Sequence, residues 1–531
     1  MIPPDTKALG EQVLRETDPY RVIGEHLADV VRDADFADLY ASDGRPAVSP
    51  ALLALVTLFQ FTENIPDRQA AHQVVVRIDW KFALHLPLGD CGFDFSDLSH
   101  FRHRLVQHHD ERRVFELVLR KIEALGLVRR RGKQRTDSLA VLGFVRQLSR
   151  LELVFETLRD VVQAWEHADP GGVPPGLRAR YLESRLDYRM SAAEQEAEMH
   201  QIGREGYELL AAVDDPTVVG APPIEVVAVL RAVWAQRYRQ EGGQVQVRAD
   251  EPDAPARIVS PHDPTVRAGK KRGTAWHGDK VHVTEAQGAE GNFLTDVTTA
   301  NASSGDGEAL PTIRAHLAQQ DLLPREHVVD AGYISGKQLA ESQALGIDLV
   351  GPPLADTSRT AFKIADFAID RTARVAICPT GQRSVKWSPR TERDGSAAVN
   401  IQFAAAACAH CRLRAPCTTS QTGRSLQLSE HYDRLQARRA EADTPAFHDR
   451  LRWRAGIEAT LSELVRAHGL RRHRYRGEAK RDHENLLKGA ACNLKRLTRA
   501  FIRRNARATD DGLHADRTIH ATQCARSAHT V

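Results

Sequence analysis

The alternation of apolar and polar residues divides the chain into helical and mixed segments. Residues 10–125 have apolar positions at helical spacing, and "SPALLALVTLFQFTE" starts with Ser49 as an N-cap candidate and Pro50 in the first turn. Short polar loops join these runs, so we expect a helical N-terminal domain over residues 1–130. Residues 146–250, rich in Glu, Gln and Arg, predict an all-helical insertion.

Short β-branched runs predict a sheet built from two separate parts of the chain. "RGKQRTDSLAVLGF" predicts a first strand within residues 131–145. Within residues 251–370, "ARIVS", "KVHVTEA" and "NFLTDVTTA" predict an antiparallel meander. "HVVDA" and "IDLVGPP" alternate with helical runs, which predicts parallel strands with helical crossovers. We therefore expect an α/β core with a mixed sheet of about five strands.

The remaining segments are less regular. Residues 371–430 predict an irregular insertion that holds four cysteines. Residues 431–505 predict long helices, of which "PAFHDRLRWRAGIEATLSELVRAHGL" is the first. Residues 506–531 are polar and lack periodicity, so we expect a disordered tail.

Composition and charge narrow the class of protein. The 531 residues exceed one ordinary domain, and 42% hydrophobic with 27% charged residues is typical of a soluble protein. No apolar run is long enough to span a bilayer, and the N-terminus lacks a secretory pattern, so we expect a cytoplasmic protein. The net charge is only +3, yet residues 451–506 and 101–135 are strongly basic. Segregated basic stretches indicate a polyanion such as nucleic acid, although solvated helix faces remain an alternative.

Three acidic residues stand where predicted elements meet. Asp137 lies in the first strand, Asp330 closes a later strand, and Glu458 lies at the edge of the apolar face of the long helix, whereas Glu463 falls on the opposite, solvated face. The structural alternatives are a turn role for Asp330 and an i,i+4 ion pair between Arg454 and Glu458. The functional alternative places the three carboxylates around Mg²⁺ or Mn²⁺, which support phosphoryl transfer.

The chain resembles the DDE transposases of bacterial insertion sequences, most of all those of the IS-eleven-eighty-two family. The resemblance covers roughly residues 15–500. It rests on the helical stretch 49–105 and on four motifs: "RTDS", "SPHDPTVRAGKKRGTAWHGDKVHVTEA", "VVDAGYIS" and "RAGIEATLSELVRAHGLRRHRYRG".

The resemblance implies an RNase H-like core preceded by a helical domain that binds the DNA end. It implies that Asp137, Asp330 and Glu458 are the catalytic, Mg²⁺-binding carboxylates, and that Arg454 is the Arg preceding the Glu. Leu451 and Val465 stand where related groups have Tyr and Lys. A homodimer is implied, because two DNA ends must be held together.

Basic residues near these motifs are candidate contacts to DNA phosphates. Arginine suits phosphate because its guanidinium forms paired hydrogen bonds. Arg454 is one candidate. The others are Arg471, Arg472, Arg474 and Arg476 after the Glu helix, and Lys270, Lys271 and Arg272 in the earlier motif.

Four cysteines have the spacing C-x29-C-x2-C-x5-C. The pair Cys408 and Cys411 has the spacing of metal ligands, and Cys378 and Cys417 complete a set of four thiolates. A structural zinc and four reduced thiols are both compatible with this pattern. A disulfide framework is not expected for seven cysteines in a chain of this length.

The leading hypothesis is a transposase that cleaves the ends of its insertion sequence and joins them to target DNA. The alternatives are an RNase H-fold nuclease without strand transfer and a non-catalytic DNA-binding protein derived from a transposase.

Overall fold

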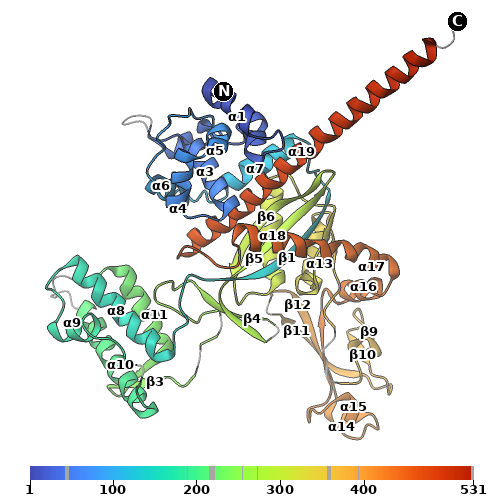
Figure 1. Cartoon of the computed structure of the whole chain (residues 1–531). Helices are drawn as coiled ribbons and strands as arrows, with labels where there is room; N and C mark the ends of the chain where they lie inside the picture. Colours follow the sequence, from blue (N-terminus) through green and yellow to red (C-terminus); the bar gives the residue numbers. More distant parts are fainter. Residues whose placement is uncertain are drawn as a thin grey trace. The chain divides into compact units, whose positions relative to one another are not determined.

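The computed structural model shows a mixed α and β chain (Figure 1). By contact it divides into a first unit, Met1–Arg129, Ser138–Ser304 and Glu458–Val531, and a second unit, Arg130–Asp137 and Gly305–Ile457. Side chains are described up to residue 507. The described residues are 1–41, 47–187, 189–214, 222–250, 252–253, 255–271, 273–355, 360–392 and 394–527.

The N-terminal part of the first unit is helical, as its periodicity predicts. Helix α3 begins as expected: the Ser49 hydroxyl accepts a hydrogen bond from the Leu52 amide at 3.1 Å, and Pro50 follows the cap. Asn64 ends it in the left-handed region, at φ 56°. The elements are α1 (Pro4–Val13), α2 (Pro19–Val22), η1 (Ile23–Leu27), η2 (Asp33–Leu39), α3 (Pro50–Glu63), α4 (Asp67–Val76), α5 (Ile78–Ala83), α6 (Ser96–Gln107) and α7 (Arg113–Ala124).

The segment predicted as an all-helical insertion also contains a hairpin. Gly242 and Gly243 form its turn with φ values of 57° and 78°, which suit a two-residue hairpin loop. Ile258 packs into the core of these helices, so "ARIVS" does not form the predicted strand. The elements are α8 (Arg150–Ala168), α9 (Pro175–Tyr181), α10 (Ala192–Asp214), α11 (Ile224–Arg237), β2 (Tyr238–Glu241) and β3 (Gln244–Val247).

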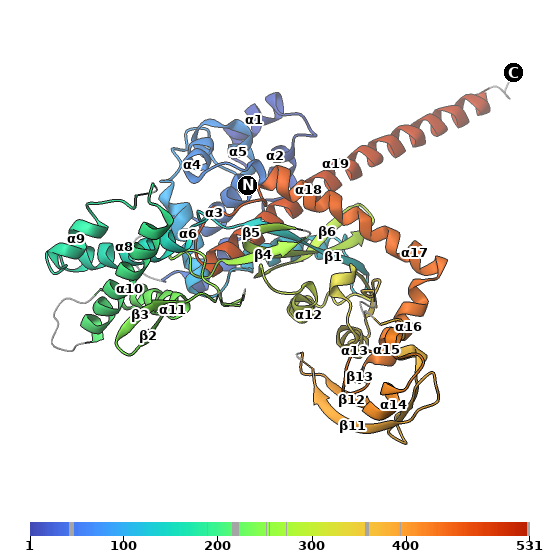
Figure 2. The same ribbon diagram turned by 90° about the horizontal axis from the view of Figure 1, so that it is seen from below.

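The sheet of the first unit contains strands β4 (Arg267–Lys271), β5 (Thr274–Gly288) and β6 (Gly291–Asn301). Both β4 and β6 pair antiparallel with β5, and the pairing of β5 with β6 has a bulge between Thr284 and Glu285. The end of β1 (Lys133–Leu142) lies beside β5, where the Gly143 amide donates to the His277 carbonyl at 2.8 Å. The long helix α19 (Glu478–Ser527) packs on β6 and on α3 and α7 (Figures 1 and 2).

The second unit contains the predicted parallel strands. The start of β1 pairs parallel with β7, in the register Lys133 opposite Glu326, and β7 pairs parallel with β8. The Thr136 hydroxyl lies 2.6 Å from His327 Nε2, which links β1 to β7 within the buried interior. The elements here are η3 (Asp306–Ala309), α12 (Leu310–Gln319), β7 (Glu326–Val328), η4 (Ala331–Tyr333), α13 (Gly336–Ala344) and β8 (Asp348–Val350).

The cysteine-containing insertion is more regular than predicted. Its strands β11, β12 and β13 form an antiparallel sheet, with α14 and α15 beside it (Figure 2). Its own small core explains the order, because Phe367, Ile401 and Phe403 are buried together. The elements are η5 (Ile364–Asp366), β9 (Ala368–Asp370), β10 (Val375–Ile377), β11 (Ser384–Thr391), β12 (Ala397–Phe403), α14 (Ala405–Ala409), α15 (Arg414–Cys417) and β13 (Ser425–Ser429).

The predicted long helix after residue 445 is interrupted. It consists of α17 (Pro445–Arg452), the 3-10 turn η6 (Trp453–Gly456) and α18 (Ile457–His468), and α16 (Tyr432–Ala442) precedes it. A helical wheel drawn through η6 therefore assigns wrong directions, because a 3-10 turn advances about 120° rather than 100° per residue.

Helix α19 continues to Ser527, where we expected a disordered tail. The segment contains alanine and arginine, which favour helix even without an apolar face. Of the helices in the described part of the chain, none has the length and hydropathy that crossing a bilayer requires.

Candidate active site

Asp330 has the turn role that its position after a strand predicts. Its Oδ1 atom accepts a hydrogen bond from the Gly332 amide at 2.8 Å and caps η4. The other carboxylate oxygen, Oδ2, is not used by this cap and lies 3.7 Å from the Arg454 guanidinium. The turn role therefore leaves one oxygen available for chemistry.

Asp137 and Asp330 converge on the same guanidinium nitrogen. The Nη2 atom of Arg454 donates to Asp137 Oδ2 at 2.9 Å and lies 3.7 Å from Asp330 Oδ2. The side chains of Asp137 and Asp330 are 11% and 27% exposed, so both carboxylates are partly desolvated. Two acidic groups, one in β1 and one in the cap of η4 after β7, thus share one cation.

The turn η6 is held by contacts of Arg135 with Trp453 and with the backbone near Gly456. The Arg135 guanidinium lies 4.4 Å from the centre of the Trp453 ring and donates to the Trp453 carbonyl. A Cβ atom at Gly456 would come within 2.4 Å of Arg135 Nη1. These contacts hold Arg454 at the site, so the predicted i,i+4 pair of Arg454 with Glu458 is replaced by the pair with Asp137.

Glu458 lies in the first turn of α18 and is exposed. Its carboxylate has no ion pair among the described residues. Glu463 was expected on the solvated face, but it is partly buried and pairs with Arg496 at 3.0 Å. The helical wheel was wrong here because it did not include Arg496 of α19, which bonds both Thr460 and Glu463.

Helix α18 is anchored by a buried polar cluster two residues after Glu458. The Thr460 hydroxyl donates to Glu285 Oε2 at 2.6 Å, and Arg496 Nη1 donates to the same oxygen at 3.1 Å. Arg496 also bonds the Thr460 hydroxyl and Glu463. The cluster fixes the rotation of α18 against β5 and so sets the direction of Glu458.

Asp306 is an acidic neighbour of Asp330 that the sequence did not single out. A Cβ atom on Gly332 would lie 2.8 Å from Asp306 Oδ2 and 3.1 Å from Asp330 Oδ1. Gly332 thus allows two carboxylates to approach each other. No sequence signal separates Asp306 from an ordinary first-turn Asp, since it begins the short helix η3.

The donor atoms of Asp137 and Asp330 suit a divalent cation. Both offer carboxylate oxygens, which Mg²⁺ and Mn²⁺ prefer, and a cationic group already lies between them. They belong to neither of the two groups of three ligating atoms that lie within 4.8 Å of one another in the described part of the chain.

The residues of those two groups are buried in the fold or paired with one another. In the first, Glu463, His468 and Cys492, burial raises the pKa of the thiol to about 12 and lowers that of the imidazole to about 4. In the second, which also includes Glu156, His262 Nδ1 lies 2.8 Å from Asp160 Oδ2, and this bond raises the pKa of His262.

The predicted DNA-contacting residues after α18 divide into two kinds. Arg471 and Arg472 are exposed and form no ion pair among the described residues. Arg474 instead makes contacts within the fold: it donates to the Ile65 carbonyl at 2.8 Å and lies over the Phe61 ring. Arg476 is exposed and lies 5.6 Å from the Phe144 ring centre.

The predicted contacts in the earlier motif fall on β4. Lys270 and Lys271 are exposed at the end of that strand, and Arg272 lies outside the described residues. Exposed cations at a strand end are suitable for a phosphate backbone.

The four predicted zinc ligands line one small cavity in the second unit. The Arg424 amide donates to Cys408 Sγ at 3.4 Å, and the Thr380 hydroxyl lies 3.1 Å from Cys378 Sγ and 3.8 Å from Cys411 Sγ. Burial raises the pKa of the Cys378 thiol, but hydrogen bonds from Thr380 and from nearby amides outweigh it and lower the pKa overall. Cys417 completes the lining, and the described cysteines are all free thiols.

Two segments of the chain match known transposase families. Residues 377–498 match the family described as Transposase DDE domain, and residues 8–104 match the one described as Transposase domain (DUF772). The first match contains Arg454, Glu458 and the four cysteines. No curated protein and no solved structure matches the chain. Both matches support a DDE transposase of the insertion-sequence type, and the specific insertion-sequence branch stays a prediction.

Proposed function

We propose that the protein cleaves DNA at the ends of its own insertion sequence and joins those ends to target DNA. The observation that supports this most is the convergence of Asp137 and Asp330, from separate strands, on one cation. The antiparallel β4–β6 and parallel β1, β7 and β8 support an RNase H-like core for this chemistry.

In this proposal Asp137, Asp330 and Glu458 hold Mg²⁺ or Mn²⁺. When bound, a pair of such ions activates the attacking oxygen and stabilises the leaving oxygen of a phosphodiester. Cleavage forms a bond from a water oxygen to phosphorus, breaks the P–O3′ bond and leaves a 3′-hydroxyl. That hydroxyl then attacks a phosphodiester of the target, so the DNA ends are exchanged without any other energy source.

The residues of the chain have distinct tasks in these steps. Asp330 keeps its Oδ1 in the cap of η4, which fixes the direction of Oδ2. Arg454 balances the charge of both aspartates before a metal binds, and afterwards its guanidinium is released to a DNA phosphate. The anchored α18 carries Glu458, whose exposed carboxylate is free to complete the site.

The test is a cleavage and joining assay with purified full-length protein and duplexes carrying the ends of the insertion sequence. We expect nicked and joined products with Mg²⁺ and none with EDTA, because the carboxylates alone do not activate water. Binding of two ends per protein dimer is expected in the same samples. Cleavage without joining would indicate a nuclease, and binding without cleavage a non-catalytic DNA-binding protein; either result contradicts the proposal.

We propose further that Cys378, Cys408, Cys411 and Cys417 bind a structural zinc ion. Elemental analysis should find about one zinc per chain, and Cys408→Ser should lose the metal and lower the melting temperature, because zinc binding contributes to folding. Cys91→Ser is the matched control, since Cys91 is an exposed thiol that does not line this cavity. If the wild-type protein contains no zinc, the proposal is wrong and the four cysteines are reduced thiols.

A further inference from the structure

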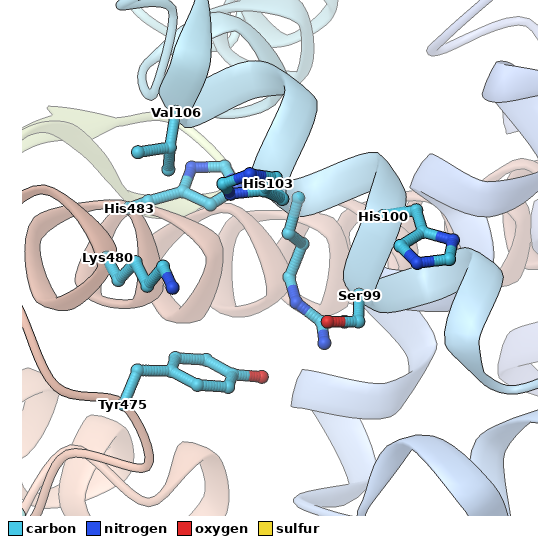
Figure 3. A pocket seen from close by; sticks show the side chains of 8 residues that line it. Ser99, His100, His103, Val106, Tyr475, Lys480 and His483 are labelled. Carbon is cyan, nitrogen blue, oxygen red and sulfur yellow. The ribbon is translucent and has the colours of Figure 1, made fainter. Parts of the chain in front are cut away.

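A second cavity lies in the first unit, on the surface of α6. Its volume is about 280 Å³, and it is formed by α6, the loop before α19 and the first turn of α19 (Figure 3). Figure 3 shows Tyr475 and Lys480 directed toward the side chains of α6. The residues that line it are Ser99, His100, Arg102, His103, Val106, Tyr475, Lys480 and His483.

The lining carries positive charge without a carboxylate. Lys480 is exposed and has no ion pair among the described residues. Arg102 is buried and its charge is balanced by Asp67, which is not among the lining residues. Lys480 is therefore an unpaired cation beside a cavity whose lining contains no carboxylate, and this arrangement favours an anionic ligand.

His483 supplies a buried polar atom that the fold does not use. Its side chain is almost fully buried, and its Nδ1 atom lies 2.8 Å from the Glu111 carbonyl. A carbonyl only accepts, so Nδ1 carries the proton and Nε2 is left without a partner among the described residues. Burial lowers the pKa of His483 to about 4, and a bound anion would oppose this by favouring the protonated, donating form.

Tyr475 and Ser99 add hydroxyl donors to this positive wall. The Arg102 guanidinium lies 5.4 Å from the centre of the Tyr475 ring, which holds the ring against α6. Burial raises the pKa of Tyr475, so its hydroxyl keeps its proton at neutral pH. Hydroxyls, a lysine and imidazoles together are the donors that bind phosphate oxygens.

We propose that this cavity binds a backbone phosphate of duplex DNA, with Lys480 as its principal charged contact. The inference rests on the proposed function for the identity of the ligand, since the lining alone specifies only a phosphate. Tyr475 and Lys480 follow α18 closely in the chain, so a phosphate held here fixes the DNA in the same unit as Glu458.

The test measures the binding of the full-length protein to a fluorescent duplex over a range of salt concentrations. Loss of one phosphate contact lowers the slope of log K against log salt by about 0.9. We expect Lys480→Ala to lower the slope by about that amount and to weaken binding about three- to tenfold, and Lys480→Arg to restore both. Arg120→Ala is the matched control, because Arg120 is an exposed cation on α7 outside the cavity.

A second arm separates DNA phosphate from free phosphate. Inorganic phosphate, added at constant ionic strength, should displace DNA from the wild type more than from Lys480→Ala. An unchanged salt slope in Lys480→Ala, or a change equal to that of Arg120→Ala, would overturn the inference, even with free phosphate bound. Wild-type protein that shows this slope but no cleavage would contradict the proposed function alone.

Discussion

Asp330→Asn is expected to abolish DNA cleavage and leave DNA binding intact. The substitution removes the charge that a divalent ion needs, and the rate should fall at least about 10³-fold. The fold should persist, because the Asn carbonyl oxygen still accepts the Gly332 amide proton that Asp330 Oδ1 accepts. The measurement is the rate of nicking of the insertion-sequence end with Mg²⁺, alongside DNA affinity and melting temperature.

Asp370→Asn provides the matched control for this variant. Asp370 also ends a short strand, β9, and its Oδ1 accepts the amides of Thr372 and Ala373 at 2.9 and 2.8 Å. Asp370 is exposed, and the ion pairs of Arg454 with Asp137 and Asp330 do not include it. Asp370→Asn should cleave like the wild type, and full activity in Asp330→Asn would remove Asp330 from the site.

The sequence predicted the elements whose signals are local. Ser49 and Pro50 marked the start of α3, and the alternation around "HVVDA" marked parallel strands, because caps and hydrophobic period depend on near neighbours. The sequence left open whether Asp330 has a turn role or a chemical role. In the structure its Oδ1 atom caps the turn, and its Oδ2 atom faces Arg454.

The sequence did not predict features that depend on distant contacts. The break at η6 comes from the packing of Arg135 on Trp453, more than 300 residues apart. The pairing of Glu463 with Arg496 of α19 is a second such contact, because a helical wheel of α18 does not include residues of another helix. Asp306 became a neighbour of Asp330 only because Gly332 has no side chain between them.

The largest expected effect on stability is that of Arg481→Met. Arg481 is 1% exposed and bonds two buried carboxylates: Nε donates to Asp279 Oδ2 at 2.6 Å, and Nη1 donates to Asp263. Methionine fills much of the space but removes the cation that both carboxylates share, and among the described residues Asp279 keeps only its contact with His473 at 3.0 Å. Breaking such a buried pair costs about 3–5 kcal/mol, which urea unfolding measures directly.

Arg499→Met is the matched control for this variant. Arg499 lies on the same helix, α19, but is 53% exposed, and its one ion pair within the described part of the chain is with Glu463, at 3.1 Å. An exposed pair contributes less than about 1 kcal/mol because water and salt screen it. Equal losses in the two variants would mean that burial of the Arg481 cluster has no energetic consequence.

The pH dependence of the stability lost in Arg481→Met shows whether the loss comes from the broken ion pairs or from poorer packing. Burial raises the pKa of Asp279, but hydrogen bonds from His473 and Arg481 outweigh it and lower the pKa below its ordinary value. In the wild type this contribution is present above the ordinary pKa and is lost as the pH falls through the lowered one. Without Arg481 only His473 among the described residues opposes the effect of burial, so the pKa of Asp279 rises relative to the wild type and protonation at lower pH relieves the buried charge. The deficit of Arg481→Met should therefore shrink between pH 7 and pH 4, whereas a deficit caused by packing alone would stay constant.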